Sequence, residues 1–366
     1  MQVLGMMSGT SLDGIDVAAL DTDGLQQITA GPSEFFAYGD ADRQCLRAAL
    51  ACAQALSTAD LRQPQAWPAP LRLAAELVTQ RHIEAASAFL AKHHTKPQLI
   101  GFHGQTVTHR PSEAMTLQIG DAASLAKALG VDVVGDFRSN DMRAGGQGAP
   151  LVPLFHAALL GAIEPPIGVV NLGGIANLTW LNGDGDILAF DTGPANALID
   201  DWVWQKTGKA FDANGELAAQ GEVDEPALQA LMSDDYFSQA APKSLDRLSF
   251  NLEPVAALSA EAGAATLTAF SAVSLAAGVQ QCPQKPSRLV LCGGGRHNAH
   301  LRRCIEVACA CEVQMCDDLG WDGDALEAQA FGWLGVRAQA GLALSLPQTT
   351  GARGPTTGGV VFKARS

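Results

Sequence analysis

The chain has few features of an exported or membrane-bound protein. Its 366 residues show no N-terminal basic region followed by an apolar run and a cleavage site, so we expect no signal peptide and a cytoplasmic protein. The longest apolar stretch, "AGAATLTAFSAVSLAAGV", is interrupted by Thr and Ser and is rich in Ala. This composition favours a buried helix over a membrane span. The sequence therefore predicts no membrane partner.

Cysteine pairs of the kind that bind metal are also missing. None of the eight cysteines forms a Cys-x-x-Cys pair, and no histidine stands at zinc-finger spacing. We interpret the cysteines as reduced thiols packed as small apolar residues, which agrees with a cytoplasmic compartment.

Positive charge is scarce. Lys and Arg number 24 against 38 Asp and Glu, so the net charge is −14, and no basic cluster offers a local exception. Nucleic acid would be repelled on average and is excluded as a partner. Any bound phosphate must be held mainly by backbone N–H groups, a metal ion and single basic residues.

The length and the order of predicted elements indicate two domains of one kind. Hydrophobic residues make up 47% of the chain, enough for substantial cores. Residues 2–24 are typical of a strand, a tight polar turn and a second strand, and the same pattern begins again at residue 167. We predict a duplicated α/β fold. The expected domains are residues 1–130, completed by a C-terminal segment 345–366, and residues 131–344.

Several further elements follow from periodicity and end signals. Asp121 suits a helix N-cap. The tail 347–359 is rich in Pro, Gly and Thr, so we expect it to be loose, with a last strand near residue 360. Helices are predicted over 40–55, 68–94, 195–207 and 256–280. Residues 97–109 and 131–150 are each predicted to be a buried strand that runs into a polar loop, and another buried strand is predicted to begin at residue 287 and end at the triple glycine.

Four glycine-rich segments follow predicted strands. The first is "GMMSGTSLDG", in which Gly, Ser and Thr let backbone N–H groups approach an anion, although no Gly-Lys-Ser/Thr closes it as in a Walker loop. The others are "NLGGIANLT", "FDTGPAN" and "LVLCGGGRHN". Loops at strand ends are where α/β proteins hold ligands, so four such loops, two of them strand–turn–strand, predict nucleotide binding.

These segments also carry a family resemblance. The layout resembles the acetate and sugar kinase, heat-shock cognate and actin superfamily, in which two ribonuclease-H-like domains clamp ATP in a cleft. Within it, the anhydro-N-acetylmuramic acid kinase family has similar segments throughout Met7 to Leu334. The matching segments are "MSGTSLDGID", "GFHGQTVTHRP", "GDFRSNDMRAGGQGAPLVP", "NLGGIANLT", "FDTGPAN", "CGGGRHN" and "WDGDALEAQAFGWL".

The resemblance implies a reaction. The family opens the 1,6-anhydro bridge of anhydro-N-acetylmuramic acid with water and phosphorylates O6 with ATP, giving N-acetylmuramate 6-phosphate and ADP in cell-wall recycling. Asp191 matches the family's catalytic aspartate, a base for water at the anomeric carbon. If Asp191 is not the base, Asp136, Asp141 and Glu327 are the next candidates.

The resemblance also implies nucleotide-binding residues and Mg²⁺. The superfamily aspartate before the first Gly-Thr is replaced by Met7, so a metal-orienting carboxylate must come from Asp13, Asp16 or Asp191, or the metal is held through waters. The residues matched to ATP are Gly9, Thr10, Ser11, Leu12, Asp13, Gly14, Ile15, Asp16, Gly174, Gly294, Gly295 and Asn298.

The sugar carries a lactyl carboxylate, which a negative protein must offset locally. Arg138 lies on a polar loop after a predicted strand and suits planar carboxylate recognition, although it could equally pair with nearby aspartates. His103 could be an ordinary turn residue, and Glu327 a helix-end residue. The residues that we predict to bind the substrate are His103, Gln105, Thr106, Arg138 and Glu327.

Three other functions remain open from the sequence. The first is a kinase for another sugar or carboxylate, and the second is an ATP-driven clamp or sensor, against which no separate peptide-binding domain is apparent. The third is a glycosidase-like hydrolase, which paired carboxylates would permit and the glycine loops disfavour. The oligomeric state is left open, with a homodimer as one candidate.

Overall fold

The computed structural model describes residues 1–9, 11–161, 166–245 and 250–364. The chain divides into two compact units, Met1–Gly161 with Ala325–Ser366, and Ala162–Asp324. The first unit thus extends beyond the expected boundary at residue 130. The strand over 133–135 joins its sheet, and the helices over 139–143 and 153–160 belong to the same unit. The segment from 325 returns to the first unit twenty residues earlier than the expected 345.

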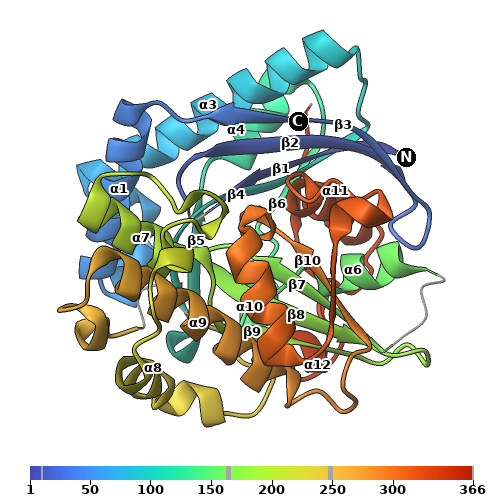
Figure 1. Ribbon diagram of the computed structural model, residues 1–366. Helices are drawn as coiled ribbons and strands as arrows, with labels where there is room; N and C mark the ends of the chain where they lie inside the picture. The colour runs from blue at the N-terminus through green and yellow to red at the C-terminus, as the bar shows by residue number, and fades with distance from the viewer. Residues whose placement is uncertain (10, 162–165, 246–249, 365–366) are drawn as a thin grey trace. The chain divides into compact units, whose positions relative to one another are not determined.

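The first unit is built on a mixed sheet. Its strand order is β12-β6-β4-β1-β2-β3, with β5 paired to β4 (Figure 1). β1, β2 and β3 run antiparallel as a meander, whereas β4 is parallel to both β1 and β6. The strands are β1 Gln2–Ser8, β2 Gly14–Thr22, β3 Ile28–Ala37, β4 Leu99–Arg110, β5 Met115–Ile119, β6 Val133–Gly135 and β12 Val360–Phe362.

Helices α1, α3 and α4 cover one face of this sheet. Alternate residues of β1, Leu4 and Met6, join a core with apolar residues of these helices, as the period of two in a strand requires. Helix α3 and the cap by Asp121 at α4 confirm two sequence predictions. The helices of the unit are α1 Asp40–Ala55, α2 Thr58–Leu61, α3 Ala69–His93, α4 Ala122–Leu129, α5 Ser139–Arg143, α6 Pro153–Leu160, α11 Leu326–Gln339 and α12 Pro347–Thr350.

Helix α11 lies against the other face at unusually close range. Gly5 of β1 and Gly101 of β4 are neighbours in the sheet. A Cβ atom built on Gly5 would lie 1.7 Å from the carbonyl oxygen of Ala328, and one on Gly101 would lie 2.0 Å from that of Phe331. Only glycine allows the helix backbone to touch the strands in this way. The contact fixes α11, whose second residue is Glu327.

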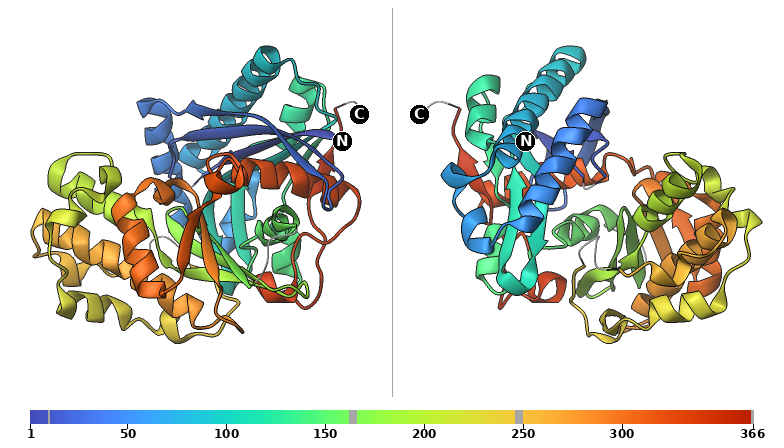
Figure 2. Two further views of the ribbon diagram at one scale, coloured as in Figure 1. Left: turned by 45° about the vertical axis from the view of Figure 1, so that its right-hand side comes forward. Right: turned by 90° about the vertical axis from the view of Figure 1, so that its left-hand side faces the viewer.

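The second unit repeats the order of the first. Its sheet has the order β11-β10-β7-β8-β9, in which β7, β8 and β9 form an antiparallel meander and β10 runs parallel to β7 and β11. The same positions are occupied by β1, β2, β3, β4 and β6 in the first unit. Figure 2 shows the second sheet from two further sides. The strands are β7 Ile167–Leu172, β8 Ile175–Leu181, β9 Ile187–Pro194, β10 Arg288–Cys292 and β11 Glu312–Met315.

Helix α9, Ala260–Val279, is the centre of the second unit's helical layer. One side packs on the sheet through Leu275 and Val279, and the other packs through Leu267 and Phe270 on α7 and α8. It is long and apolar enough to cross a membrane, but 72% of its most apolar window is buried, as in a core helix. It begins later than the expected residue 256 because Ser259 caps it. The other helices are α7 Asn196–Thr207, α8 Glu225–Met232 and α10 Ala299–Cys309.

In the first unit one sequence prediction was wrong, and one strand had not been predicted. The tail was expected to be loose, but the Thr350 hydroxyl donates to the buried Asp141 carboxylate at 2.6 Å, and Arg353 N–H donates to the Ala144 carbonyl at 3.2 Å. Strand β3 was not expected, because it is an edge strand whose residues are mostly exposed and lack the alternation of a half-buried strand.

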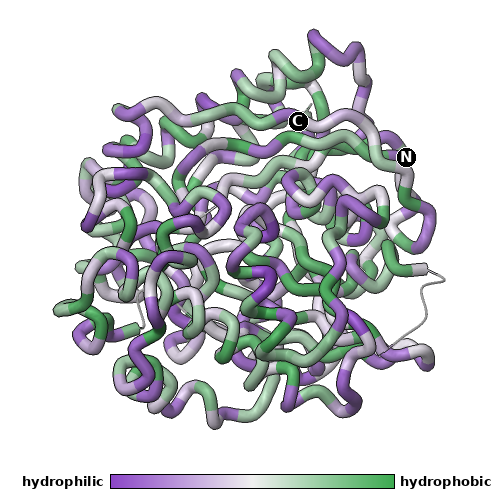
Figure 3. Tube along the Cα trace, in the orientation of Figure 1, coloured by the Kyte–Doolittle hydropathy of each residue, from purple (hydrophilic) through white to green (hydrophobic). Residues whose placement is uncertain are grey.

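Figure 3 shows the strands rich in apolar colour and many connecting turns hydrophilic.

Candidate functional site

The turn between β1 and β2 is held in a fixed shape. Leu12 has a left-handed backbone with φ of 58°, yet its side chain is only 5% exposed and belongs to the core. Its N–H donates to the Gly9 carbonyl at 3.3 Å. The Asp13 carbonyl accepts a hydrogen bond from Tyr38 N–H at 2.8 Å. A non-glycine residue in this region costs energy, so burial of its side chain holds the turn. Thr10 lies outside the described residues.

A buried polar network fixes the end of β1 to β4. The Ser8 hydroxyl donates to the Gln105 amide oxygen, and it also lies 3.0 Å from the Tyr38 hydroxyl. The Gln105 amide nitrogen donates to the Gly9 carbonyl at 2.9 Å. Gln105 is fully buried, so both ends of its amide serve the turn. Burial raises the pKa of Tyr38 to about 12, which keeps its hydroxyl neutral.

His103 and Arg138 form a second polar pair in the first unit. His103 Nδ1 lies 2.9 Å from the Gly104 carbonyl, so it carries the proton and leaves Nε2 as an acceptor. Arg138 donates to this Nε2 from Nε at 3.1 Å and to the Gly148 carbonyl at 2.8 Å. Burial and the Arg138 charge hold the pKa of His103 well below its usual value, so the ring stays neutral. His103 is therefore a partner of Arg138 that the sequence did not suggest.

Neighbouring side chains extend the His103–Arg138 pair into a longer row of polar groups, which we call the polar wall. The Gln118 amide nitrogen donates to the hydroxyls of Thr106 at 3.1 Å and Thr116 at 2.8 Å. The Phe331 ring of α11 lies 4.4 Å from the His103 ring, which places α11 beside the pair. Thr106 and Glu327 are both half-buried. Of the predicted sugar-binding residues, the structure thus places His103 directly beside Arg138, and Gln105 behind the turn between β1 and β2.

In the second unit three glycine-rich segments converge. Asn196 N–H donates to the Gly173 carbonyl at 3.0 Å, which joins the "GPAN" segment to the turn between β7 and β8. A Cβ on Gly295 would lie 2.6 Å from the Leu172 Cβ and 2.8 Å from the Asn196 amide nitrogen. The triple-glycine turn therefore rests on the other two segments. Gly294 is exposed, whereas Asn298 caps α10 by accepting from Leu301 N–H at 2.9 Å.

Asp191 lies on β9, in the same unit. Its side chain is 8% exposed, and its carboxylate accepts a hydrogen bond from Leu245 N–H at 2.8 Å. The Tyr236 hydroxyl donates to the Asp191 carbonyl, and Asp191 N–H donates to the Lys243 carbonyl at 2.9 Å. The bond from Leu245 orients the nearly buried carboxylate, and the other two bonds hold the backbone that carries it; a general base needs such fixed geometry. No pattern in the sequence pointed to the support of Asp191 by Tyr236 and the segment 243–245.

The other carboxylates named as candidate bases have different surroundings. Asp141 is 2% exposed, and it accepts hydrogen bonds from the Ser345 and Thr350 hydroxyls and from Gly148 N–H. It is thus occupied in joining the tail to the loop after β6. Asp136 is exposed and has a left-handed backbone with φ of 53° at the end of β6. Such strain at a strand end is a feature of ligand-binding loops.

The structure also shows the surroundings of Met7, which stands where the superfamily that the chain resembles has an aspartate. Met7 pairs directly with Asp16 across the β1–β2 hairpin, so the two side chains lie on one face of the sheet. Asp13 is exposed and accepts from the Ser11 hydroxyl at 2.7 Å. Among the described residues no group of three His, Cys, Asp or Glu is arranged to hold a metal ion. Carboxylate oxygen, ATP phosphate and water suit Mg²⁺ without such a cage.

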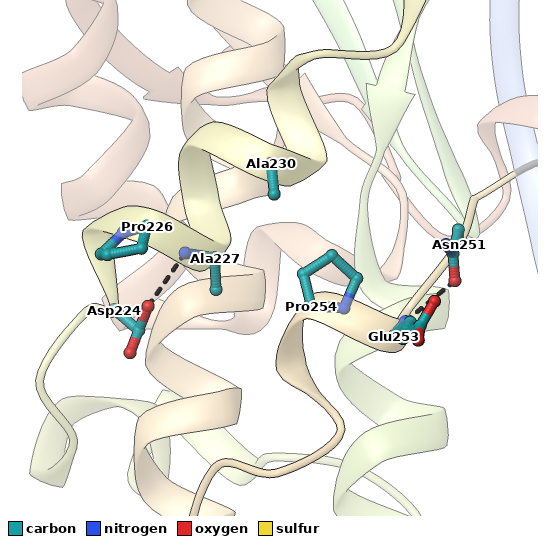
Figure 4. Close-up of a pocket in the computed structure, with 7 residues that line it drawn as sticks. All are labelled: Asp224, Pro226, Ala227, Ala230, Asn251, Glu253 and Pro254. Atoms are coloured by element: carbon teal, nitrogen blue, oxygen red, sulfur yellow. Dashed lines mark hydrogen bonds between the residues drawn. The ribbon is translucent and has the colours of Figure 1, made fainter.

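A surface pocket of the second unit lies apart from these segments. It has a volume of about 440 Å³ and is lined by α8 and the turn at Glu253 (Figure 4). Its rim carboxylate Asp224 accepts from Ala227 N–H as the cap of α8, and Asn251 accepts from Glu253 N–H. None of the predicted site residues lines it.

Comparison with known proteins decides the family. A family model described as anhydro-N-acetylmuramic acid kinase matches residues 1–364. The chain belongs to the anhydro-N-acetylmuramic acid kinase family. It is 49% identical to the family member of Rhodospirillum rubrum, over 99% of this chain and 94% of that protein. The member of Acidiphilium cryptum is also 49% identical, over 99% and 98% of the two chains.

Membership establishes an enzyme, a kinase. Solved structures are only distantly similar. One is the activator of 2-hydroxyisocaproyl-CoA dehydratase from Clostridium difficile with bound ADPNP, at 12% identity, TM-score 0.43 and coverage of 93% and 96% of the two chains. Another is a ROK family glucokinase from Streptomyces griseus, at 12% identity, TM-score 0.39 and coverage of 91% and 98%.

Proposed function

We propose that this protein opens the 1,6-anhydro bridge of anhydro-N-acetylmuramic acid with water and phosphorylates O6 with ATP, giving N-acetylmuramate 6-phosphate and ADP. The observation that carries the proposal, beside family membership, is the nearly buried, oriented carboxylate of Asp191 in a unit whose glycine segments converge. The reaction belongs to cell-wall recycling in the cytoplasm, where all eight cysteines would stay free thiols, as they are here.

In the proposed mechanism Asp191 accepts a proton from water as the water oxygen attacks C1. The C1–O6 bond breaks, and the electron pair stays on O6. O6 then takes the γ-phosphoryl group of ATP, and ADP leaves. The proton on Asp191 returns to solvent. Coupling of the two steps supplies the driving force, because a carboxylate alone is a modest base.

The nucleotide is assigned to both sets of glycine segments. The turn Gly9–Asp16, with Thr10, would meet the phosphates through backbone N–H groups, and Gly174 would serve the second phosphate turn. The exposed Gly294 with Gly295 and Asn298 would meet adenosine. Because the Asn298 side-chain oxygen caps α10, its amide nitrogen is the group available for a ligand.

Mg²⁺ would neutralise the phosphate charge that a protein of net charge −14 cannot. Asp16 is the carboxylate placed on the face of Met7, with Asp13 and Asp191 as the other candidates. ATP binding should therefore need a divalent metal. Binding of ATP at full strength in excess chelator, measured by calorimetry, would contradict this assignment.

The sugar is assigned to the polar wall of His103, Thr106, Arg138 and Glu327, with Gln105 acting through the phosphate turn that it holds. Neutral His103 accepts from Arg138 and orients its guanidinium. We expect Arg138→Ala to raise KM for the anhydro sugar far more than KM for ATP. Equal changes in both would show that Arg138 is structural.

The deciding experiment incubates the protein with Mg-ATP and the anhydro sugar in ¹⁸O-water. We expect ADP and a phosphosugar that carries one label at C1, detected by mass spectrometry. Label on phosphate would mean that water attacks ATP. Turnover of other sugars but not of this one would favour a different kinase, and ring opening without ATP would favour a hydrolase.

A further inference from the structure

Arg296 follows the triple-glycine turn and has no role in the mechanism above. It is one of the largest buried side chains of the protein, at 2% exposure. It forms ion pairs with Asp317, from Nε at 2.7 Å, and with Asp324, from Nη1 at 2.6 Å. A buried guanidinium is stable only when it is paired in this way.

All five N–H donors of Arg296 are used. Nη2 donates to the second oxygens of Asp317 and Asp324, at 3.3 and 3.0 Å, and the remaining proton of Nη1 meets the Gly293 carbonyl at 3.1 Å. No donor is left for a ligand, because a guanidinium has five. Arg296 can therefore act on a nucleotide only through the turn whose first carbonyl it holds.

The electrostatic balance favours the charged forms of Arg296, Asp317 and Asp324. Burial works against the guanidinium, but the hydrogen bonds and charges of Asp324 and Asp317 outweigh it and raise the pKa of Arg296. Hydrogen bonds from Arg296 in turn lower the pKa of both carboxyls. The three groups thus stay ionised around neutral pH.

Packing confirms that the arrangement is built for this side chain. A Cβ on Gly323 would lie 2.6 Å from Arg296 Nε and 2.5 Å from the Cys316 sulfur, so only glycine leaves room for the guanidinium. On its other side the turn rests on Leu172 and Asn196 through Gly295. The triple-glycine turn is therefore held from both sides.

Asp324, to which Arg296 is bound, also lies at a boundary between units along the chain. Asp324 is the last residue of the second unit, and Ala325 begins the segment that forms α11 of the first unit. Arg296 thus ties the glycine turn to the residues at which the chain passes from one unit to the other. Glu327 comes three residues later.

We propose that Arg296 is a positioning residue for adenosine, which fixes the Gly293–Gly295 turn by anchoring it to Asp317 and Asp324. The inference rests on the proposed function, in which Gly294 and Gly295 meet adenosine. Lysine cannot replace Arg296, because a single ammonium cannot hold two carboxylates in the planar, doubly bonded geometry of a guanidinium.

The test compares Arg296→Lys, Asp317→Asn and Asp324→Asn with the wild type. Each variant is assayed for kcat, for KM of ATP and of the sugar, and for ADP binding by calorimetry. We expect Arg296→Lys to weaken ADP binding and raise KM for ATP by about tenfold or more, as loss of charge-assisted hydrogen bonds predicts. KM for the sugar should stay within about twofold. The Asp variants should show the same pattern, more weakly.

Arg81→Lys is the matched control. Arg81 also binds two carboxylates, Asp42 at 3.1 Å and Glu84 at 2.8 Å, but it lies in the first unit on α3. Its ATP parameters should not change. If Arg296→Lys does not fold, Asp324→Asn keeps the test, because the Asp324 side chain is 64% exposed and bears less of the packing.

Two results separate the possible failures. Folded Arg296 and Asp324 variants that bind ADP as the wild type does, or that raise KM for ATP and sugar equally, would overturn the positioning role while wild-type turnover leaves the proposed function intact. A wild type that binds no adenine nucleotide and makes no phosphosugar would overturn the proposed function itself.

Discussion

The two units have the same strand order but end their central strands differently. In the first, β4 continues for twelve residues, pairs with β5 and carries the polar wall of His103, Thr106 and their neighbours. In the second, β10 stops after five residues at a triple-glycine turn. The hairpins differ as well, because residues 9–13 separate β1 from β2, whereas only Gly173 and Gly174 separate β7 from β8. One duplicated framework thus offers side chains at one strand end and bare backbone at the other.

The largest expected effect separates chemistry from binding. Asp191→Asn keeps the shape of the side chain in the second unit and removes the base. We expect kcat to fall by about 10²–10⁴-fold, as for positioned general bases. ADP binding, measured by calorimetry, should change little, because the turns that we assign to the phosphates are other segments.

Near-normal turnover of Asp191→Asn would break the assignment of the base to the second unit. Attention would then move to the first unit, where Asp136, Asp141 and Glu327 lie. Asp136→Asn serves as the parallel variant, and it should keep most of the turnover if Asp191 is the base.

The second prediction compares how closely each sheet is packed within its own unit. Gly101→Ala should destabilise the first unit by about 3–5 kcal/mol, because the new methyl group meets helix backbone that cannot move aside. In Gly168→Ala, in β7 of the second unit, the nearest atoms to the new methyl group are the side-chain ends of Leu289 and Leu178, so the change should cost about 1 kcal/mol. Urea unfolding measures both, and equal costs would contradict the close helix contact.

Acid should affect the first unit before the second. Burial lowers the pKa of His82 to about 4 and that of His156 to about 3, and His103 is lowered as well. The unfolded chain therefore binds these protons first, so the stability is complete above about pH 6.5 and is lost as the pH falls towards 4. Each histidine contributes a slope of about 1.4 kcal/mol per pH unit.

Hydrogen exchange at pH 7 and pH 5, resolved by peptide, measures this difference. All three histidines lie in the first unit, and in the described part of the second unit His300 is half-buried and His297 exposed. Peptides of the first sheet should lose protection first. Earlier loss in the second unit would show that other groups control acid stability.

The smallest effect involves the two tyrosines of the chain. Tyr38→Phe removes a hydrogen bond to Ser8, worth about 1 kcal/mol, beside the turn that we assign to the phosphates, so we expect KM for ATP to rise by up to about fivefold. Tyr236→Phe removes the bond to the Asp191 carbonyl and should lower kcat instead. The same kinetic change in both variants would mean that neither tyrosine serves a particular step.

The sequence by itself determined the duplicated α/β order, the bounds of helices α1, α3, α7 and α9 to within a few residues, and the segments that carry the family. Those features depend on local periodicity, on caps such as Asp121 and on glycine at strand ends, all of which are written in neighbouring residues. The assignments of Asp191 and Arg138 also came from the sequence, and they stay predictions until they are measured.

Only the tertiary structure decided which distant groups meet. It paired Arg138 with His103 across 35 residues, placed Gln105 behind the β1–β2 turn, bound Asp141 to the tail and set Arg296 between Asp317 and Asp324. Each of these side chains could have found several partners of suitable charge. Which partner it meets depends on how strands and helices pack, and no local pattern in the chain records that.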